Sequence, residues 1–199
     1  MNNTQKKSAA IFAALAVLMA ATRFNHFGTA VSLPDASYAV FFLGGLYLAG
    51  FARASAVAFV ALVLEAGLID YYATSVQGVS DWCMTPAYWF LIPTYASLWM
   101  VGRWVALRQL AQEQTMESRS LAELALAAWV ASSFAFVFSN ATFYLFSGRY
   151  AEMSALEYAS RVDQYYVSYV SVAMLYIACV IAMQMAANII GKQGRIHTH

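Results

Sequence analysis

Long uninterrupted apolar runs constrain this chain more than any other feature of its sequence. Six of them occur, at residues 8–21, 36–52, 54–72, 86–107, 121–146 and 165–190. A helix needs roughly 20 mostly apolar residues to cross the hydrocarbon core, where its backbone groups must bond within the helix itself. The first run approaches this length when it is extended through Phe24. The runs therefore predict an all-α integral membrane protein with six transmembrane helices.

The composition supports the same fold class. Of the 199 residues, 62% are hydrophobic and only 11% are charged, which is far from the balance of a soluble domain. The runs show no alternation of period two, which argues against a membrane β-barrel. Without an internal repeat or a linker, residues 1–199 are expected to form a single transmembrane domain, and the tail 191–199 is set aside as either disordered or added in cloning. The polar connection 109–120 is expected to be a solvated loop.

The distribution of Lys and Arg predicts the orientation of the bundle, since cytoplasmic loops retain these residues. With both termini inside, Lys6, Lys7, Arg53, Arg103, Arg108, Arg119, Lys192 and Arg195 lie on one side, against Arg23, Arg149 and Arg161 on the other. We therefore expect cytoplasmic N- and C-termini and an outer surface built from residues 23–35, 71–85 and 147–164. The net charge of +1 and the lack of a basic cluster give no sign of a nucleic-acid partner.

The two cysteines of the chain fall in different environments. Cys83, in the stretch SDWCMTPAYW, lies in the second outer connection, whereas Cys179 falls in the middle of the sixth run. A disulfide between them is therefore not expected. Cys179 is interpreted as a small packing residue. Cys83 is either a spectator within an interfacial belt of aromatic residues or a soft donor for a transition metal.

One cysteine cannot build a structural zinc site, because the usual Cys and His partners are missing. We therefore expect no structural metal bound by the protein itself. A single thiolate is nevertheless sufficient to occupy one axial position on a metal whose other ligands arrive with a bound molecule.

Three segments of the chain resemble a known family of transporters. They are TRFNHFG at residues 22–28, LPDASYAVFFLGGLYL at 33–48 and SDWCMTPAYW at 80–89. With six helices and both termini inside, the chain resembles the BtuM-type vitamin B12 transporters, which are similar to the S-components of energy-coupling-factor transporters. The resemblance covers most of the chain, and Cys83 is its most specific element.

This resemblance implies cobalamin uptake across the bacterial inner membrane by an S-component-like bundle. Cobalamin would be the substrate, and Cys83 would be the axial ligand of its cobalt in place of the nucleotide base. The resemblance leaves open whether Cys83 is also catalytic by assisting loss of the upper axial ligand. The implied partners are cobalamin or a related corrinoid, the lipid bilayer and, if transport is not autonomous, an energy-coupling-factor module.

Further polar residues near the outer end are candidates for contacts with the corrinoid, namely His26, Asp70, Tyr88, Arg149 and Arg161. Each has an ordinary alternative. His26 and Tyr88 suit the membrane interface, and Asp70 suits a solvated helix end. The two arginines either bind amide carbonyls or a phosphate, or pair with nearby acidic residues. Asp35 and Ser37 either belong to the family pattern or cap the second helix.

Two further features have alternative interpretations. Tyr158, Tyr165, Tyr169 and Tyr176 are spaced seven, four and seven residues apart, which aligns them on one helix face. Such a stripe either packs against a neighbouring helix or lines a ligand wall. Glu65 lies near the middle of the third run, where an uncompensated charge costs roughly a few kcal/mol, so it is expected to be protonated, paired or facing a polar cavity.

The main alternative function is a tryptophan-rich tetrapyrrole-binding receptor without transport, based on Trp82, Trp89, Trp99, Trp104 and Trp129. It would not require Cys83, whereas the transporter does. A bis-histidine haem carrier needs more than one histidine in the membrane domain, and a thiol oxidoreductase needs a second cysteine nearby. The nucleotide-binding pattern GxxxxGK[ST] does not occur, so we do not expect this chain to hydrolyse ATP.

Overall fold

The computed structural model describes residues 3–23, 33–111 and 118–196, and all regular structure in them is helical. The elements in chain order are α1 (Asn3–Arg23), α2 (Ser37–Tyr47), α3 (Ala52–Ser75), the 3-10 helix η1 (Pro86–Phe90), α4 (Leu91–Ala111), α5 (Ser118–Phe146) and α6 (Ala155–Ile196). The predicted all-α class is therefore confirmed over the described part of the chain.

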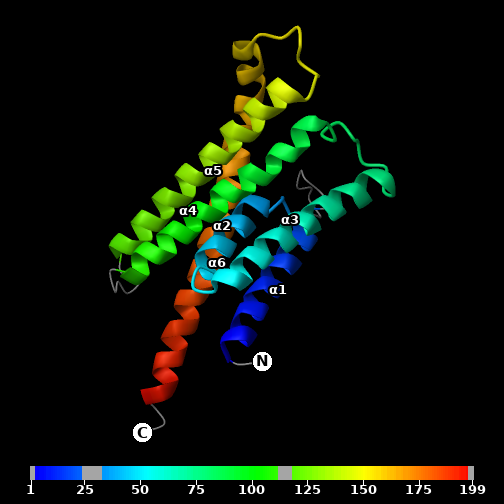
Figure 1. Cartoon of the computed structure of the whole chain (residues 1–199). Helices are drawn as coiled ribbons and strands as arrows, with labels where there is room; N and C mark the ends of the chain where they lie inside the picture. The colour runs from blue at the N-terminus through cyan, green and yellow to red at the C-terminus, as the bar shows by residue number, and fades with distance from the viewer. Residues whose placement is uncertain (1–2, 24–32, 112–117, 197–199) are drawn as a thin grey trace.

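The α-helices form one bundle in which successive helices run in alternating directions (Figure 1). As a result, α1 begins and α6 ends at the same end of the bundle. The connections after α3 and before α6 lie towards the opposite end. The sequence predicted this grouping of the connections.

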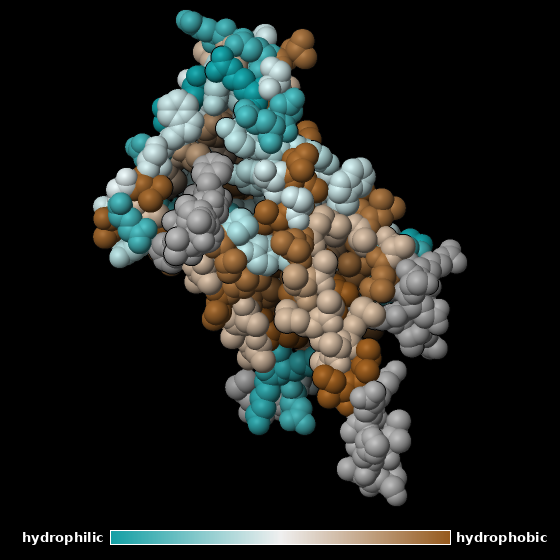
Figure 2. Space-filling model, turned by 180° about the vertical axis from the view of Figure 1, so that it is seen from behind, coloured by the Kyte–Doolittle hydropathy of each residue, from teal (hydrophilic) through white to brown (hydrophobic). Residues whose placement is uncertain are grey.

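Three helical segments are long enough and apolar enough to cross a membrane, namely Arg53–Ser75, Leu121–Phe146 and Ala155–Ile190. Apolar side chains cover a broad zone around the middle of the molecule, and hydrophilic side chains gather towards its ends (Figure 2). Many large apolar side chains on these helices are exposed, including Leu64, Val137 and Leu175. An exposed apolar band between two polar ends is the surface of a membrane protein.

Helix α2 is much shorter than the apolar run that contains it. It ends at Tyr47, and the chain turns at residues 48–50 before α3 begins. Eleven residues rise only about 16 Å, roughly half the thickness of the hydrocarbon core. Hydropathy alone predicted a longer helix because the turn that follows is itself apolar.

Helix α6 begins ten residues earlier than its apolar run predicts, so the predicted outer connection 147–164 is wrong in its second half. The hydroxyl of Ser154 accepts a hydrogen bond from the backbone N–H of Glu157 at 3.3 Å, which stabilises a helix start. The polar residues that follow hid this start from a hydropathy pattern. At its other end α6 continues to Ile196, into the segment set aside as a tail. The predicted polar loop 109–120 is also shorter at both ends, because α4 extends to Ala111 and α5 begins at Ser118.

The core of the bundle is the contact between α2 and α4. A Cβ atom added at Gly45 would collide with the backbone of Trp99, and one added at Gly102 would collide with the backbone of Phe42. The two helices therefore touch backbone to backbone, as small residues allow in membrane bundles. At the cavity end of this contact the rings of Phe41 and Tyr95 stack with their centroids 4.1 Å apart.

Replacing Gly102 by alanine is expected to lower the free energy of unfolding by about 1–3 kcal/mol, because overpacking forces the backbones of α2 and α4 apart. Gly67→Ala in α3 is the matched control, since a Cβ at Gly67 meets no atom within 4 Å. Alanine there is expected to be neutral or to stabilise by up to about 1 kcal/mol. Thermal unfolding of both variants in the same detergent compares them. Equal stability of the two variants would show that the helices are not in backbone contact.

Candidate functional site

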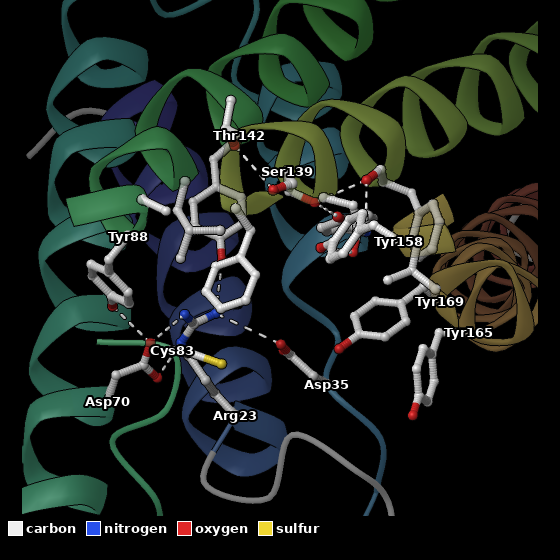
Figure 3. Close-up of a pocket in the computed structure, with 18 of the residues that line it drawn as sticks. Arg23, Asp35, Asp70, Cys83, Tyr88, Ser139, Thr142, Tyr158, Tyr165 and Tyr169 are labelled. Carbon is white, nitrogen blue, oxygen red and sulfur yellow. Dashed lines mark hydrogen bonds and ion pairs between the residues drawn. The ribbon is translucent and has the colours of Figure 1, made fainter. Parts of the chain in front are cut away.

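A cavity of about 330 Å³ lies at the end of the bundle opposite the termini. Its lining comes from both ends of the sequence, from Arg23 at the end of α1 to Tyr169 in α6. Figure 3 shows two sides, with Arg23, Asp70, Tyr88 and Cys83 on one and Ser139, Tyr158 and Tyr169 on the other. The cavity therefore forms only when all parts of the bundle are in place.

Arg23 is the centre of a buried polar network, and only 2% of it is exposed. Its Nε and Nη2 donate to the two carboxylate oxygens of Asp70 at 2.9 and 2.7 Å. Its Nη1 donates to Ser37 Oγ at 2.6 Å and to the Tyr95 hydroxyl at 2.9 Å. One guanidinium group thus ties the end of α1 to α2, α3 and α4. A bidentate ion pair between arginine and a carboxylate is both strong and fixed in geometry.

Asp70 connects this network to the segment that carries Cys83. Its Oδ2 accepts a hydrogen bond from the Tyr88 hydroxyl at 2.7 Å, and Tyr88 lies in η1, which follows the Cys83 segment directly. Asp70 is only 5% exposed, so the solvated helix end that was its ordinary alternative is wrong. Asp70 and Tyr88 both line the cavity, and their contact with a ligand stays a prediction.

Asp35 lies between the network and the start of α2. Its Oδ1 accepts hydrogen bonds from the backbone N–H of Ser37 at 2.9 Å and from the Ser37 hydroxyl at 2.6 Å. Its Oδ2 lies 3.7 Å from Nη1 of Arg23. The N-cap of α2 is Ala36 and has no side-chain cap, so neither Asp35 nor Ser37 is the cap residue. Asp35 holds Ser37 from outside the helix and also adds a second carboxylate to the cavity lining.

Cys83 is an unbonded, solvent-exposed cysteine that also lines the cavity. Partial burial among protein atoms raises the pKa of its thiol, the Asp70 carboxylate raises it further, and the Arg149 guanidinium opposes the rise. An ordinary cysteine already has a pKa of about 8.5. The thiol is therefore protonated at neutral pH until a ligand favours the thiolate.

The side of the cavity formed by α5 and α6 is aromatic and neutral. Three of the four tyrosines of the predicted stripe, Tyr158, Tyr165 and Tyr169, line it. The fourth, Tyr176, donates to the backbone oxygen of Pro34 at 2.9 Å. The stripe is thus mainly a cavity wall, with a packing role at one end.

The two arginines predicted as ligand contacts lie outside the cavity lining. Arg149 sits over the ring of Trp82, with its Cζ 4.0 Å from the ring centroid. It therefore packs against the neighbour of Cys83 in the sequence. Arg161 pairs with Glu157 at 2.9 Å on the exposed surface of α6, which is the alternative that the sequence left open. His26 lies outside the described residues.

The tryptophans do not gather into one site. Trp99 is buried against Phe41 and Phe59 in the core. Trp104 lies against Arg108 near the other end of α4, and Trp129 is exposed on α5. No tryptophan is among the described residues that line the cavity. The arrangement gives no support to a tryptophan-rich tetrapyrrole site.

Two residues within the predicted spans lie away from the cavity. Cys179 is a free cysteine exposed on α6, so its interpretation as a buried packing residue is wrong. Hydropathy failed here because lipid-facing and protein-facing positions of a membrane helix are equally apolar. Glu65 is half-buried on α3 and does not line the cavity.

The sequence missed most of the other cavity residues, among them Arg23, Tyr38 and Tyr95 and the α5 residues Ser139 and Asn140. Arg23 was counted only as one of the outer charges, and the two tyrosines were taken as parts of apolar runs. A signal for Arg23 was present, because an ionisable residue at the end of an apolar run requires a partner. Asp35 and Asp70, the acidic residues at the ends of neighbouring apolar runs, were the candidates for this partner.

The donor set limits which metals the site is able to hold. Among the described residues, no group of three or more His, Cys, Asp or Glu side chains has the arrangement of a metal site. Cys83 fits a different role, as one soft axial donor to a metal that is already held by other ligands.

The cavity volume limits how a large ligand fits. Pockets for drug-sized molecules range over roughly 300–1,000 Å³, so this cavity lies at the small end. A ligand larger than such molecules would place only a part of itself in this cavity. In comparisons with known proteins, no family model and no curated protein matches this chain.

Proposed function

We propose that this protein takes up cobalamin across the bacterial inner membrane and binds the corrinoid at the outer end of the bundle. The observation that carries the proposal is the free, exposed thiol of Cys83 at an aromatic cavity, at the end opposite both termini. The resemblance to BtuM-type transporters assigns this cysteine to cobalt. The ligand would be base-off, with the Cys83 sulfur in the place of the nucleotide base.

The proposed topology has six crossings with cytoplasmic termini. The alternating helix directions and the Lys and Arg bias support it. Helix α2 crosses together with the non-helical residues at its ends. Non-helical backbone at membrane depth is tolerated where protein surrounds it. Ala36 before α2 and Leu48 and Ala49 after it are buried within the bundle.

The cavity residues have distinct roles in the proposed binding. Cys83 gives its proton to solvent and donates its sulfur to cobalt, which favours the thiolate. Asp70 and Tyr88 hold the segment that carries Cys83, through the bond of Tyr88 to Asp70 and of Asp70 to Arg23. The aromatic side chains of α5 and α6 contact the part of the ligand that enters the cavity.

Release to the cytoplasm requires the cavity to reach the inner side. Either the whole bundle tilts against an energy-coupling-factor module, or this chain moves alone. Growth on limiting cobalamin in a strain without the coupling module distinguishes these two routes.

Binding is expected to protect Cys83 from a thiol reagent that does not cross membranes. In intact spheroplasts without ligand, the reagent should label Cys83 from outside, and saturating cobalamin should abolish the labelling. Cys83→Ala is the control for labelling of Cys179. A protein that stays folded but neither retains corrinoid absorbance nor shows this protection is not a cobalamin transporter. Labelling only after the inner face is opened would reverse the topology.

A further inference from the structure

We propose that the cavity wall formed by α5 and α6 selects neutral carboxamide groups on the ligand and excludes carboxylates. The inference rests on the proposed corrinoid function and adds to it a chemical criterion for the accepted ligand. It is carried by the hydrogen-bonding groups of the wall and by the charges that line the cavity.

The wall presents donors and acceptors without charge. Asn140 accepts a hydrogen bond from the Tyr158 hydroxyl at 3.3 Å and donates from Nδ2 to the backbone oxygen of Phe136 at 2.9 Å. An amide nitrogen has two donor hydrogens, and a tyrosine oxygen also accepts. Asn140 and Tyr158 therefore keep capacity for a ligand. A carboxamide also has both a donor and an acceptor, so it matches this pair.

The neighbouring position on α5 has the same character. Ser139 Oγ lies 3.2 Å from the Tyr38 hydroxyl and donates to the backbone oxygen of Phe136 at 3.1 Å. A hydroxyl oxygen is able to accept more than one hydrogen bond. The polar groups along this side are thus neutral, and Ser139, Tyr158 and Tyr169 lie across the cavity from Cys83 (Figure 3).

The charges in the lining oppose an anionic ligand. Arg23 is the only cation among the described residues that line the cavity, and its N–H groups donate to Asp70, Ser37 and Tyr95. Asp35 and Asp70 add two carboxylates to the same lining. Arg149, held over Trp82, is not part of it. A carboxylate at the α5–α6 wall would lose water, and the one cation of the described lining already donates to protein groups, so its burial is much costlier than that of a hydrogen-bonded amide.

The test compares two corrinoids that differ only in these groups. One lacks the nucleotide and has neutral peripheral amides, and the other is the same molecule with its amides hydrolysed to carboxylates. Absorbance titration of the purified full-length protein at pH 7 is expected to give at least about 10-fold weaker binding for the carboxylate form. Equal affinities would overturn the selectivity and leave the proposed function intact. Failure of both probes to bind would overturn the proposed function itself.

A cation placed in the wall should reduce the discrimination. Tyr165 lines the cavity and is 45% exposed, so Tyr165→Lys places an ammonium group at the wall without burying it fully. The introduced ammonium group pairs with the carboxylates of the anionic probe and favours its binding. We therefore expect the preference for the amide probe, measured as the ratio of the two affinities, to fall by at least about 3-fold. Leu156→Lys, at an exposed position of α6 outside the lining, should leave the ratio unchanged. The comparison of probes on the unmodified protein decides the proposal even if a variant fails to fold.

Discussion

Replacing Cys83 by alanine or by serine is expected to abolish the cobalt–sulfur absorption of the bound corrinoid. It should also weaken binding by about 100-fold or more, because changes to residues that only support a metal ligand already cost 10–100-fold. A serine hydroxyl does not substitute, since it is a harder donor and does not ionise near neutral pH. Absorbance spectra and titrations of the purified variants in detergent measure both effects.

Cys179→Ala is the matched control for this prediction. Both cysteines are free and exposed, but only Cys83 lines the cavity. The Cys179 variant should keep the spectrum and the affinity of the unmodified protein. An electron-rich thiolate should also loosen the upper axial ligand of cobalt, so loss of a bound cyanide should depend on Cys83 alone. An unchanged spectrum in Cys83→Ala would make this thiol a spectator.

Arg23→Ala is expected to lower the free energy of unfolding by about 3–5 kcal/mol, because it leaves the buried Asp70 carboxylate without its cation. Arg161→Ala removes another arginine that pairs with a carboxylate, but that pair is exposed, with 60% of Arg161 and 51% of Glu157 accessible. Loss of the exposed pair should change stability by about 0–1 kcal/mol. Thermal unfolding of the two variants in the same detergent gives the comparison.

The double variant Arg23→Met with Asp70→Leu separates the cost of an unpaired charge from the loss of packing. Replacing both partners of a buried ion pair by apolar residues is often neutral or stabilising. The double variant should therefore recover much of the stability lost in Arg23→Ala. Similar destabilisation by Arg23→Ala and Arg161→Ala would show that the Arg23 network contributes little to stability.

The sequence predicted from hydropathy where the helices lie along the chain, although not the end of α2 or the start of α6. Each apolar run contains a helix, and the connections after α3 and before α6, both assigned to the outer side, lie towards one end. Cys83, Asp70 and Tyr88 were identified as site residues and do line the cavity. These three residues lie at or near the ends of apolar runs on the predicted outer side, and two of them belong to the stretch SDWCMTPAYW. Both facts were enough to predict that they lie close together.

The sequence did not predict features that depend on which face of a helix meets a neighbour. Arg23 and Asp70 are 47 residues apart, and no local pattern joins them. Tyr38 and Tyr95 resemble any other aromatic residue in an apolar run until the Arg23 network and Ser139 place them at the cavity. The interpretation of Cys179 was wrong for the same reason, since its apolar surroundings did not show whether it faces protein or lipid.

The Arg23 network also determines when the cavity is able to form as the chain is synthesised. Arg23 belongs to α1, which emerges before the helices that carry its partners, since Asp70 and Tyr95 follow it by 47 and 72 residues. Until those segments have inserted, the Arg23 guanidinium has neither Asp70 nor Tyr95 and must remain hydrated at the membrane surface. The opposite wall reaches Tyr169 and is made last. In a ribosome-bound chain that stops before α6, the hydrogen bonds of the Arg23 network should therefore be formed, but the binding cavity should be incomplete.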